Sequence, residues 1–152
     1  GKWTMASKTI DDNNDLVPQY NKVTITPNID GTQIAITIAA NRELIADFSD
    51  GKIKIVGGRP AGSFSSGSGT NKKTYYLSSI ILDSQNQNLT WSNFVTSTAR
   101  FSSDGSFEFA SDGSWDGYLS DSFGIGAFSS STFSESTWLG QLYLFITPKF
   151  YR

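Results

Sequence analysis

Residues 23–39 read VTITPNIDGTQIAITIA, and this stretch decides the fold class. Apolar and polar side chains alternate on both sides of the Asp30-Gly31 pair, and the three isoleucines of 34–38 share one face. A period of two is typical of a strand with one buried face. Asp-Gly favours a tight hairpin turn because glycine and aspartate tolerate a positive φ. The stretch therefore predicts an antiparallel hairpin with its isoleucines in the core.

The same pattern continues through most of the chain. Alternating or apolar runs occur at residues 41–48, 53–55, 75–82, 89–101 and 138–151. The helix propensity of 42–46 also allows a short helix over 41–48, but we favour a strand there. These runs predict about 8–10 antiparallel strands with turns between them, which is typical of a β-barrel or β-sandwich. No linker divides the 152 residues, so we expect one all-β domain over 1–152.

The sequence also predicts two loops and a set of core residues. The stretches 57–71 and 122–136 are rich in glycine and serine, and they predict long flexible loops. The predicted core consists of Trp3, Val23, Ile25, Ile34, Ile36, Ile38, Tyr75, Leu77, Phe107, Phe109, Leu142, Leu144 and Ile146.

The composition excludes several kinds of site. The chain has no cysteine and no histidine, which excludes thiolate chemistry, imidazole-bound zinc and a Ser-His-Asp triad. The net charge is −2 and no basic run exceeds Lys72-Lys73, so we expect no nucleic-acid partner. No segment approaches the roughly 20 apolar residues of a membrane-spanning helix. We expect no cofactor and no catalytic residues.

Acidic residues are conspicuous, yet they are typical of turns. Five Asp-Gly pairs begin at Asp30, Asp50, Asp104, Asp112 and Asp116. Asp11, Asn13 and Asp15 have the spacing of the first half of an EF-hand loop, but the glycine and the closing glutamate of that loop are missing. We therefore favour turns and a solvated loop over a calcium site and predict no metal.

The first residues carry a resemblance to a known family. Gly1-Lys2-Trp3 resembles the G-x-W motif that opens the first strand of lipocalins. The resemblance implies an eight-stranded barrel in which an arginine, Arg152 or Arg100, packs across the tryptophan. The second lipocalin motif, Thr-Asp-Tyr, is absent.

A broader resemblance involves the lipocalin-like β domains of Bacteroidetes surface lipoproteins. It rests on the opening Lys2-Trp3-Thr4, on Ile25-Thr26-Pro27, on the strand that begins at Asp50-Gly51, and on residues 101–105. It favours the barrel and implies a non-catalytic module of a longer exported protein at the cell surface. A removed N-terminal segment would carry the lipid anchor. The family has no site motif, so no functional residue can be transferred.

Aromatic residues near turns are the best candidates for a binding site. Trp115, Asp116 and Tyr118 place two rings and a carboxylate within one turn, and Trp91 lies near a strand end. Rings can stack on the apolar face of a sugar while the carboxylate accepts hydrogen bonds from its hydroxyls. Alternatively, these rings cover the core.

A catalytic carboxylate pair is the weakest candidate. Glu108 with Asp112 or Asp116 could act as a glycosidase acid and base, but Glu108 lies between Phe107 and Phe109 and should face solvent.

Three functional classes follow, in order of preference. The first is a non-catalytic binding module of a cell-surface lipoprotein, with a glycan or a surface protein as partner. The second is a lipocalin-like carrier of a small apolar ligand. The third is a glycoside-active enzyme.

Overall fold

The computed structural model describes residues 1–86, 88–90, 96–111 and 119–152, and it confirms the all-β prediction. No helix within these ranges is long and apolar enough to cross a bilayer. Two short 3-10 helices, η1 (Gly69–Asn71) and η2 (Glu135–Thr137), accompany the strands. The strands are β1 (Lys2–Ile10), β2 (Leu16–Pro27), β3 (Gln33–Ala39), β4 (Arg42–Ser49), β5 (Lys52–Val56), β6 (Pro60–Ser66), β7 (Lys73–Asp83), β8 (Asn88–Thr90), β9 (Thr96–Phe101), β10 (Phe107–Ala110), β11 (Ser122–Phe128) and β12 (Trp138–Tyr151).

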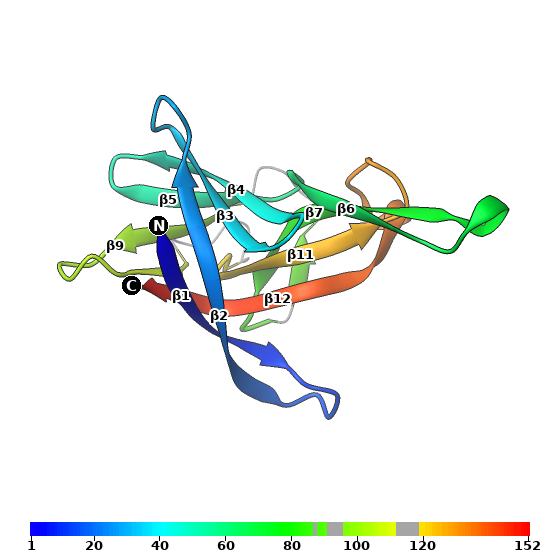
Figure 1. Ribbon diagram of the computed structural model, residues 1–152. Coiled ribbons are helices and arrows are strands. Elements are labelled where there is room, and N and C mark those ends of the chain that lie inside the picture. Colours follow the sequence, from blue (N-terminus) through cyan, green and yellow to red (C-terminus); the bar gives the residue numbers. More distant parts are fainter. Residues whose placement is uncertain (87, 91–95, 112–118) are drawn as a thin grey trace.

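Eight of these strands form a closed antiparallel barrel. Its order is β1-β2-β3-β4-β5-β9-β10-β12, and β12 pairs with β1 to close the ring. The first five strands are joined by consecutive hairpins. Both chain ends lie at the same end of the barrel (Figure 1). The predicted barrel is therefore present, with further strands outside it.

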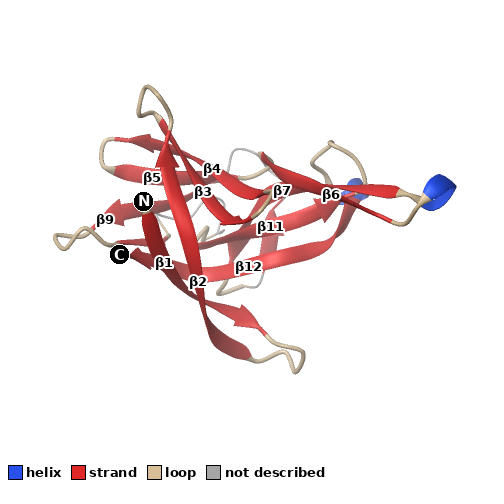
Figure 2. Cartoon of the chain, viewed as in Figure 1, coloured by secondary structure: helices blue, strands red, loops and turns tan. Residues whose placement is uncertain are grey.

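A second sheet extends from the barrel along β12. The first part of β12 pairs with β11, which pairs with β7, and β7 in turn pairs with β6 and β8. The last part of β12, from Ile146 onward, returns to the barrel beside β1. The β6–β7 hairpin projects away from the chain ends, and strands make up nearly all of the regular structure (Figure 2).

Aromatic side chains fill the interior. Trp3 packs on Phe107 with ring centroids 5.3 Å apart, and Phe107 stacks on Phe150 at 4.7 Å. Phe109 then meets Phe123 of the second sheet at 4.9 Å. An eight-stranded barrel is just wide enough for its side chains to fill it. The barrel and the second sheet therefore share one core.

Most of the predicted core is confirmed. Val23, Ile34, Ile36, Leu77 and Phe107 are buried. So are Ile25, Phe109, Leu144 and Ile146, whereas Trp3, Ile38 and Tyr75 are half-buried. Leu142 is 42 % exposed, so its predicted burial is wrong. A bulge causes the error: Ile125 pairs with Tyr143 and Gly126 with Gln141, which leaves Leu142 unpaired and turned outward.

The predicted loop at 57–71 is also wrong. Most of it forms β6 and η1, and β6 pairs with β7. Gly62 has φ +124° and interrupts the register with β7, and the backbone of Asn41 lies where its Cβ would stand. The glycine therefore marks a bulge and a close backbone approach rather than a flexible loop.

The predicted loop at 122–136 contains a central strand. β11 lies between β7 and β12, and nearly all of its residues are buried. A Cβ on Gly126 would collide with the indole ring of Trp138. Glycine permits this close packing of ring against backbone, and for that reason a buried strand resembles a loop in the sequence.

The turn interpretation of the Asp-Gly pairs is confirmed where the structure describes them. Asp50 and Gly51 both have positive φ, as a two-residue hairpin requires. The carboxylates of Asp30 and Asp104 each accept two hydrogen bonds from the residue two positions later. These hydrogen bonds lower the pKa of both aspartates. The bond from the side-chain hydroxyl, of Thr32 or of Ser106, has the largest effect. Asp112 and Asp116 lie outside the described residues.

Candidate functional site

The four predicted ligand-binding residues lie outside the described residues. Trp115, Asp116 and Tyr118 belong to 112–118, and Trp91 belongs to 91–95. The predicted aromatic site therefore stays a prediction.

Asp83 is fully buried at the end of β7, where two segments of the chain meet. Its carboxylate accepts hydrogen bonds from the backbone N–H groups of Gln85, Asn86 and Leu119 and from the side-chain amide of Asn86. Burial by itself would raise the pKa of Asp83. The hydrogen bonds, led by the one from Leu119, outweigh burial and lower the pKa.

Asp121 anchors the start of β11 in a similar way. Its carboxylate accepts from the N–H and hydroxyl of Ser84 and from the hydroxyl of Ser122. The Ser122 oxygen accepts the N–H of Thr147, whose φ is +42°. All these oxygens have protein partners, so we assign both buried aspartates a structural role.

The stretch considered for calcium, with Asp11, Asn13 and Asp15, forms a hydrogen-bonded turn. The Asp11 carboxylate accepts the N–H groups of both Asn13 and Asp15, each at 2.9 Å. Within the described residues, no three acidic side chains gather where they could hold a metal.

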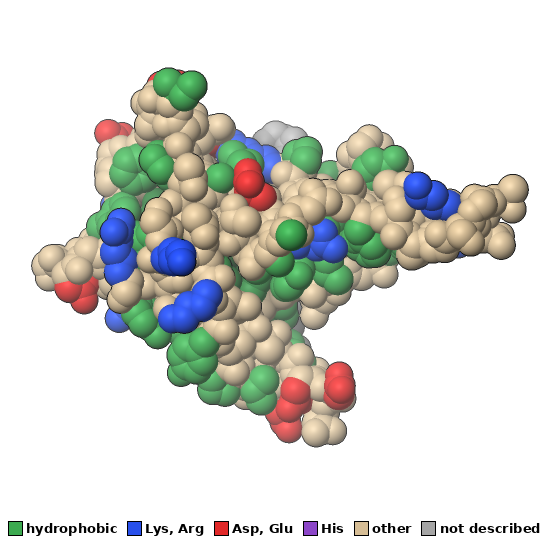
Figure 3. Space-filling view, viewed as in Figure 1, with side chains coloured by type: hydrophobic (Ala, Val, Ile, Leu, Met, Phe, Trp, Pro, Cys, Tyr) green, Lys and Arg blue, Asp and Glu red, His purple; other side chains and the backbone are tan. Residues whose placement is uncertain are grey.

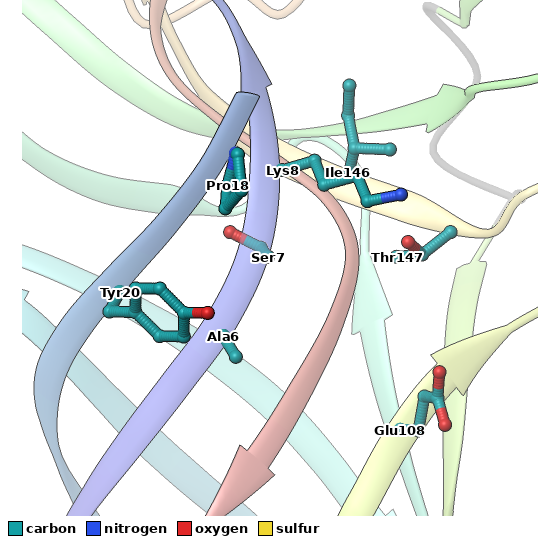
Figure 4. A pocket seen from close by; sticks show the side chains of 8 residues that line it. All are labelled: Ala6, Ser7, Lys8, Pro18, Tyr20, Glu108, Ile146 and Thr147. Atoms are coloured by element: carbon teal, nitrogen blue, oxygen red, sulfur yellow. The ribbon is translucent and has the colours of Figure 1, made fainter. Parts of the chain in front are cut away.

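A hollow with a volume of about 410 Å³ lies on the outer wall of the barrel (Figure 4). Four strands line it, namely β2, β1, β12 and β10. The lining residues are Pro18, Tyr20, Ala6, Ser7, Lys8, Ile146, Thr147 and Glu108. We call this hollow the outer groove.

Local irregularities in two strands create the outer groove. The pairing of β1 with β12 shifts between Ala6 and Lys8, and Thr147 opposite them has a left-handed backbone. Gln19 links three strands at this position, since its side-chain amide donates to the hydroxyl of Ser7 on β1 and to the carbonyl of Leu144 on β12. A bulge bends the strand and redirects side chains, which opens a depression in an otherwise regular wall.

The groups around the outer groove suit a polar ligand with an apolar face. The ring of Tyr20 stands at its edge and is 70 % exposed. Glu108 offers a carboxylate, as its predicted outward orientation between two buried phenylalanines is confirmed. Lys8 offers an ammonium group, and Thr147 a hydroxyl. Among the described residues that line the groove, Glu108 is the sole carboxylate, so the groove provides no acid–base pair for glycoside cleavage.

A second, apolar hollow of about 290 Å³ lies at the barrel end that carries both chain ends. Phe107 and Ile53, each 1 % exposed, are its most buried lining residues, and Phe48 and Phe101 also line it. Arg152 lies over Trp3, with its guanidinium carbon 4.7 Å from the ring centroid. The predicted arginine–tryptophan packing is thus present, with Arg152 rather than Arg100.

Comparisons with models of known protein families, with curated proteins and with solved structures gave no match.

No single motif in the sequence marks the outer groove. Lys8 and Tyr20 share the β1–β2 hairpin, whereas Thr147 lies far along the chain and reaches them only when β12 closes onto β1. The available signal was the polar alternation in 18–22, where Pro18, Tyr20 and Lys22 share the exposed face of β2.

Proposed function

We propose that this protein is a non-catalytic binding module and that its outer groove holds a carbohydrate. The exposed ring of Tyr20 beside Glu108 and Lys8 carries the proposal. An aromatic ring supplies contact to the C–H face of a sugar, while a carboxylate and an ammonium orient its hydroxyls. The setting on a bacterial lipoprotein at the cell surface rests on the sequence resemblance alone.

The filled interior favours this function over that of an apolar carrier. A carrier needs a cavity that encloses most of its ligand. Here the stacked rings of Phe107 and Phe150 occupy the barrel, and the 290 Å³ hollow reaches only as far as Phe107 and Ile53. The outer groove is larger and has polar groups on several sides.

Replacement of Tyr20 tests the location of the site. Tyr20→Ala should abolish glycan-array binding and leave the melting temperature within about 2 °C, because an exposed ring contributes little to stability. Tyr76→Ala is the matched control, since Tyr76 is also exposed but lies on the β6–β7 hairpin. It should bind normally.

The same array distinguishes the outer groove from the site predicted in the sequence. Trp115→Ala should leave binding intact if the outer groove is the site. Loss of binding in Trp115→Ala but not in Tyr20→Ala would move the site to residues 112–118. Absence of binding by the unmodified protein to any glycan would refute the proposal.

A further inference from the structure

One row of outward-facing positions crosses six barrel strands through the outer groove. Its members, paired strand to strand, are Tyr20, Ala6, Lys149, Glu108, Arg100 and Lys52. The residues beside the row along the strands, such as Phe107 and Phe150, point into the core. Neighbouring strands lie about 4.8 Å apart, and the row curves around the closed barrel. Tyr20, Lys149 and Glu108 therefore lie on the strands that line the outer groove, whereas Arg100 and Lys52 lie farther round.

Two further lysines extend this basic wall. Lys8 lines the groove itself, and Lys22 lies on the next outward row, where its ammonium donates to the hydroxyl of Thr4 at 2.8 Å. Glu108 is the single acidic member of the row. The wall around the outer groove, formed by Lys8, Lys22 and Lys149 beside Glu108, therefore carries an excess of positive charge.

Several acidic residues of the described part of the chain lie away from this wall, although the whole chain has a net charge of −2. Asp30, Asp50 and Asp104 lie in turns, and Asp83 and Asp121 are buried. In Figure 3 blue side chains lie over the barrel strands near the chain ends and also on the projecting β6–β7 hairpin, and red side chains lie mainly at projecting turns. The separation is partial, because the charge of Lys149, besides the hydrogen bonds from Ser106, lowers the pKa of Asp104.

We infer that the ligand of the outer groove is an anionic glycan, a sugar chain that bears carboxylate or sulfate groups. This inference rests on the function proposed above. Lysines spaced along a wall attract a chain of regularly placed anions, because opposite potentials steer encounter and select the partner. Tyr20 and Glu108 then contact the sugar ring between the anionic groups.

Glu108 favours a sugar over a nucleic acid as the polyanion. It stands within the basic row, with Lys149 on one side and Arg100 on the other. A carboxylate there repels phosphate, which accepts hydrogen bonds but has none to donate. A glycan brings hydroxyl donors to Glu108 together with anions for the lysines, so it satisfies both kinds of group.

Calorimetric titration with a matched pair of sugars tests the inference. The probes are a hexamer of galacturonic acid and a neutral hexamer of galactose, with duplex DNA as a third ligand. We expect the acidic hexamer to bind at least about tenfold more tightly than the neutral one. Its affinity should fall as salt rises from about 0.05 to about 0.5 M, because exposed charges are screened over shorter distances.

Charge-removing variants locate the effect. Lys8→Gln with Lys149→Gln should weaken binding of the acidic hexamer by about tenfold, since each variant removes a surface charge that attracts an anion of the ligand. Lys72→Gln with Lys73→Gln removes the same charge from the β6–β7 hairpin and should change affinity less than twofold. Unchanged melting temperatures would show that all variants are folded.

The outcomes separate this inference from the function on which it rests. Equal, salt-independent binding of both hexamers would refute an anionic ligand and leave the carbohydrate groove intact. Tight binding of DNA that matches the acidic hexamer would refute the selection of sugar by Glu108. Absence of binding by either hexamer, and by every array glycan, would refute both proposals.

Discussion

The first five barrel strands and the β7–β11 pair of the second sheet differ in how far apart their partners lie in the sequence. In the barrel, β1 to β5 are joined as consecutive hairpins, each closed by a short turn. In the second sheet, β11 pairs with β7, so that Ser122 lies opposite Leu82. Buried aspartates support these distant pairings, whereas alternation and turns are enough for the hairpins. The difference shows that local pattern encodes the hairpins from β1 to β5, whereas the β7–β11 pair, like the β12–β1 pair that closes the barrel, depends on long-range contacts.

The largest effect should come from the barrel core. Ile36 is fully buried, so Ile36→Ala should lower the free energy of unfolding by about 2–5 kcal/mol. Ile29→Ala, in the exposed β2–β3 turn, is the control and should change it by less than about 0.5 kcal/mol. Denaturant titration measures both. A loss below about 1 kcal/mol for Ile36→Ala would mean that the barrel hairpins do not depend on their inward face.

A smaller and more local effect should come from Asp83. Asp83→Asn removes an acceptor from several N–H groups and should cost about 1–3 kcal/mol. Hydrogen exchange should quicken in β7 and β8 before it quickens in β2 and β3. Asp50→Asn is the control, because asparagine also tolerates the positive φ of that turn. Uniformly faster hydrogen exchange throughout the chain would show that the barrel and the second sheet unfold as one unit.

Acid should weaken the second sheet through the same carboxylate. The pKa of Asp83 is lower in the folded protein than its ordinary value of 3.8. Its contribution to stability is therefore fully present above that value and is lost as pH falls through the folded pKa. Melting temperature against pH should decline below about pH 4, and the decline should be shallower in Asp83→Asn. Identical profiles would exclude Asp83 as the cause.

The smallest effect should come from the open end of the barrel. Arg152→Gln removes the cation over Trp3 and should cost about 0.5–1 kcal/mol, the usual range for an exposed cation–π pair. Lys2→Gln removes a neighbouring charge that is exposed and should cost less. Tryptophan fluorescence should report a change around Trp3 in the first variant only. A cost of several kcal/mol would show that Arg152 closes the barrel rather than covering its end.

Part of the candidate site could have been found in the sequence. The alternation in β2 places Tyr20 and Lys22 on an exposed face, and the position of Glu108 between two phenylalanines predicts its outward direction. The hollow itself could not be predicted. It depends on the shifted pairing of β1 with β12 and on the unusual backbone of Thr147, and neither leaves a pattern in residues close along the chain.

The sequence by itself determined the all-β class, the hairpins around Asp30 and Asp50, and most of the barrel core. These features follow from side-chain period and turn chemistry, which act between residues near one another. Tertiary structure alone decided that the glycine-rich residues 122–128 form a buried central strand and that scattered lysines form one wall. The physical reason is that strand register sets which distant side chains share a face, and register is fixed only when the barrel closes.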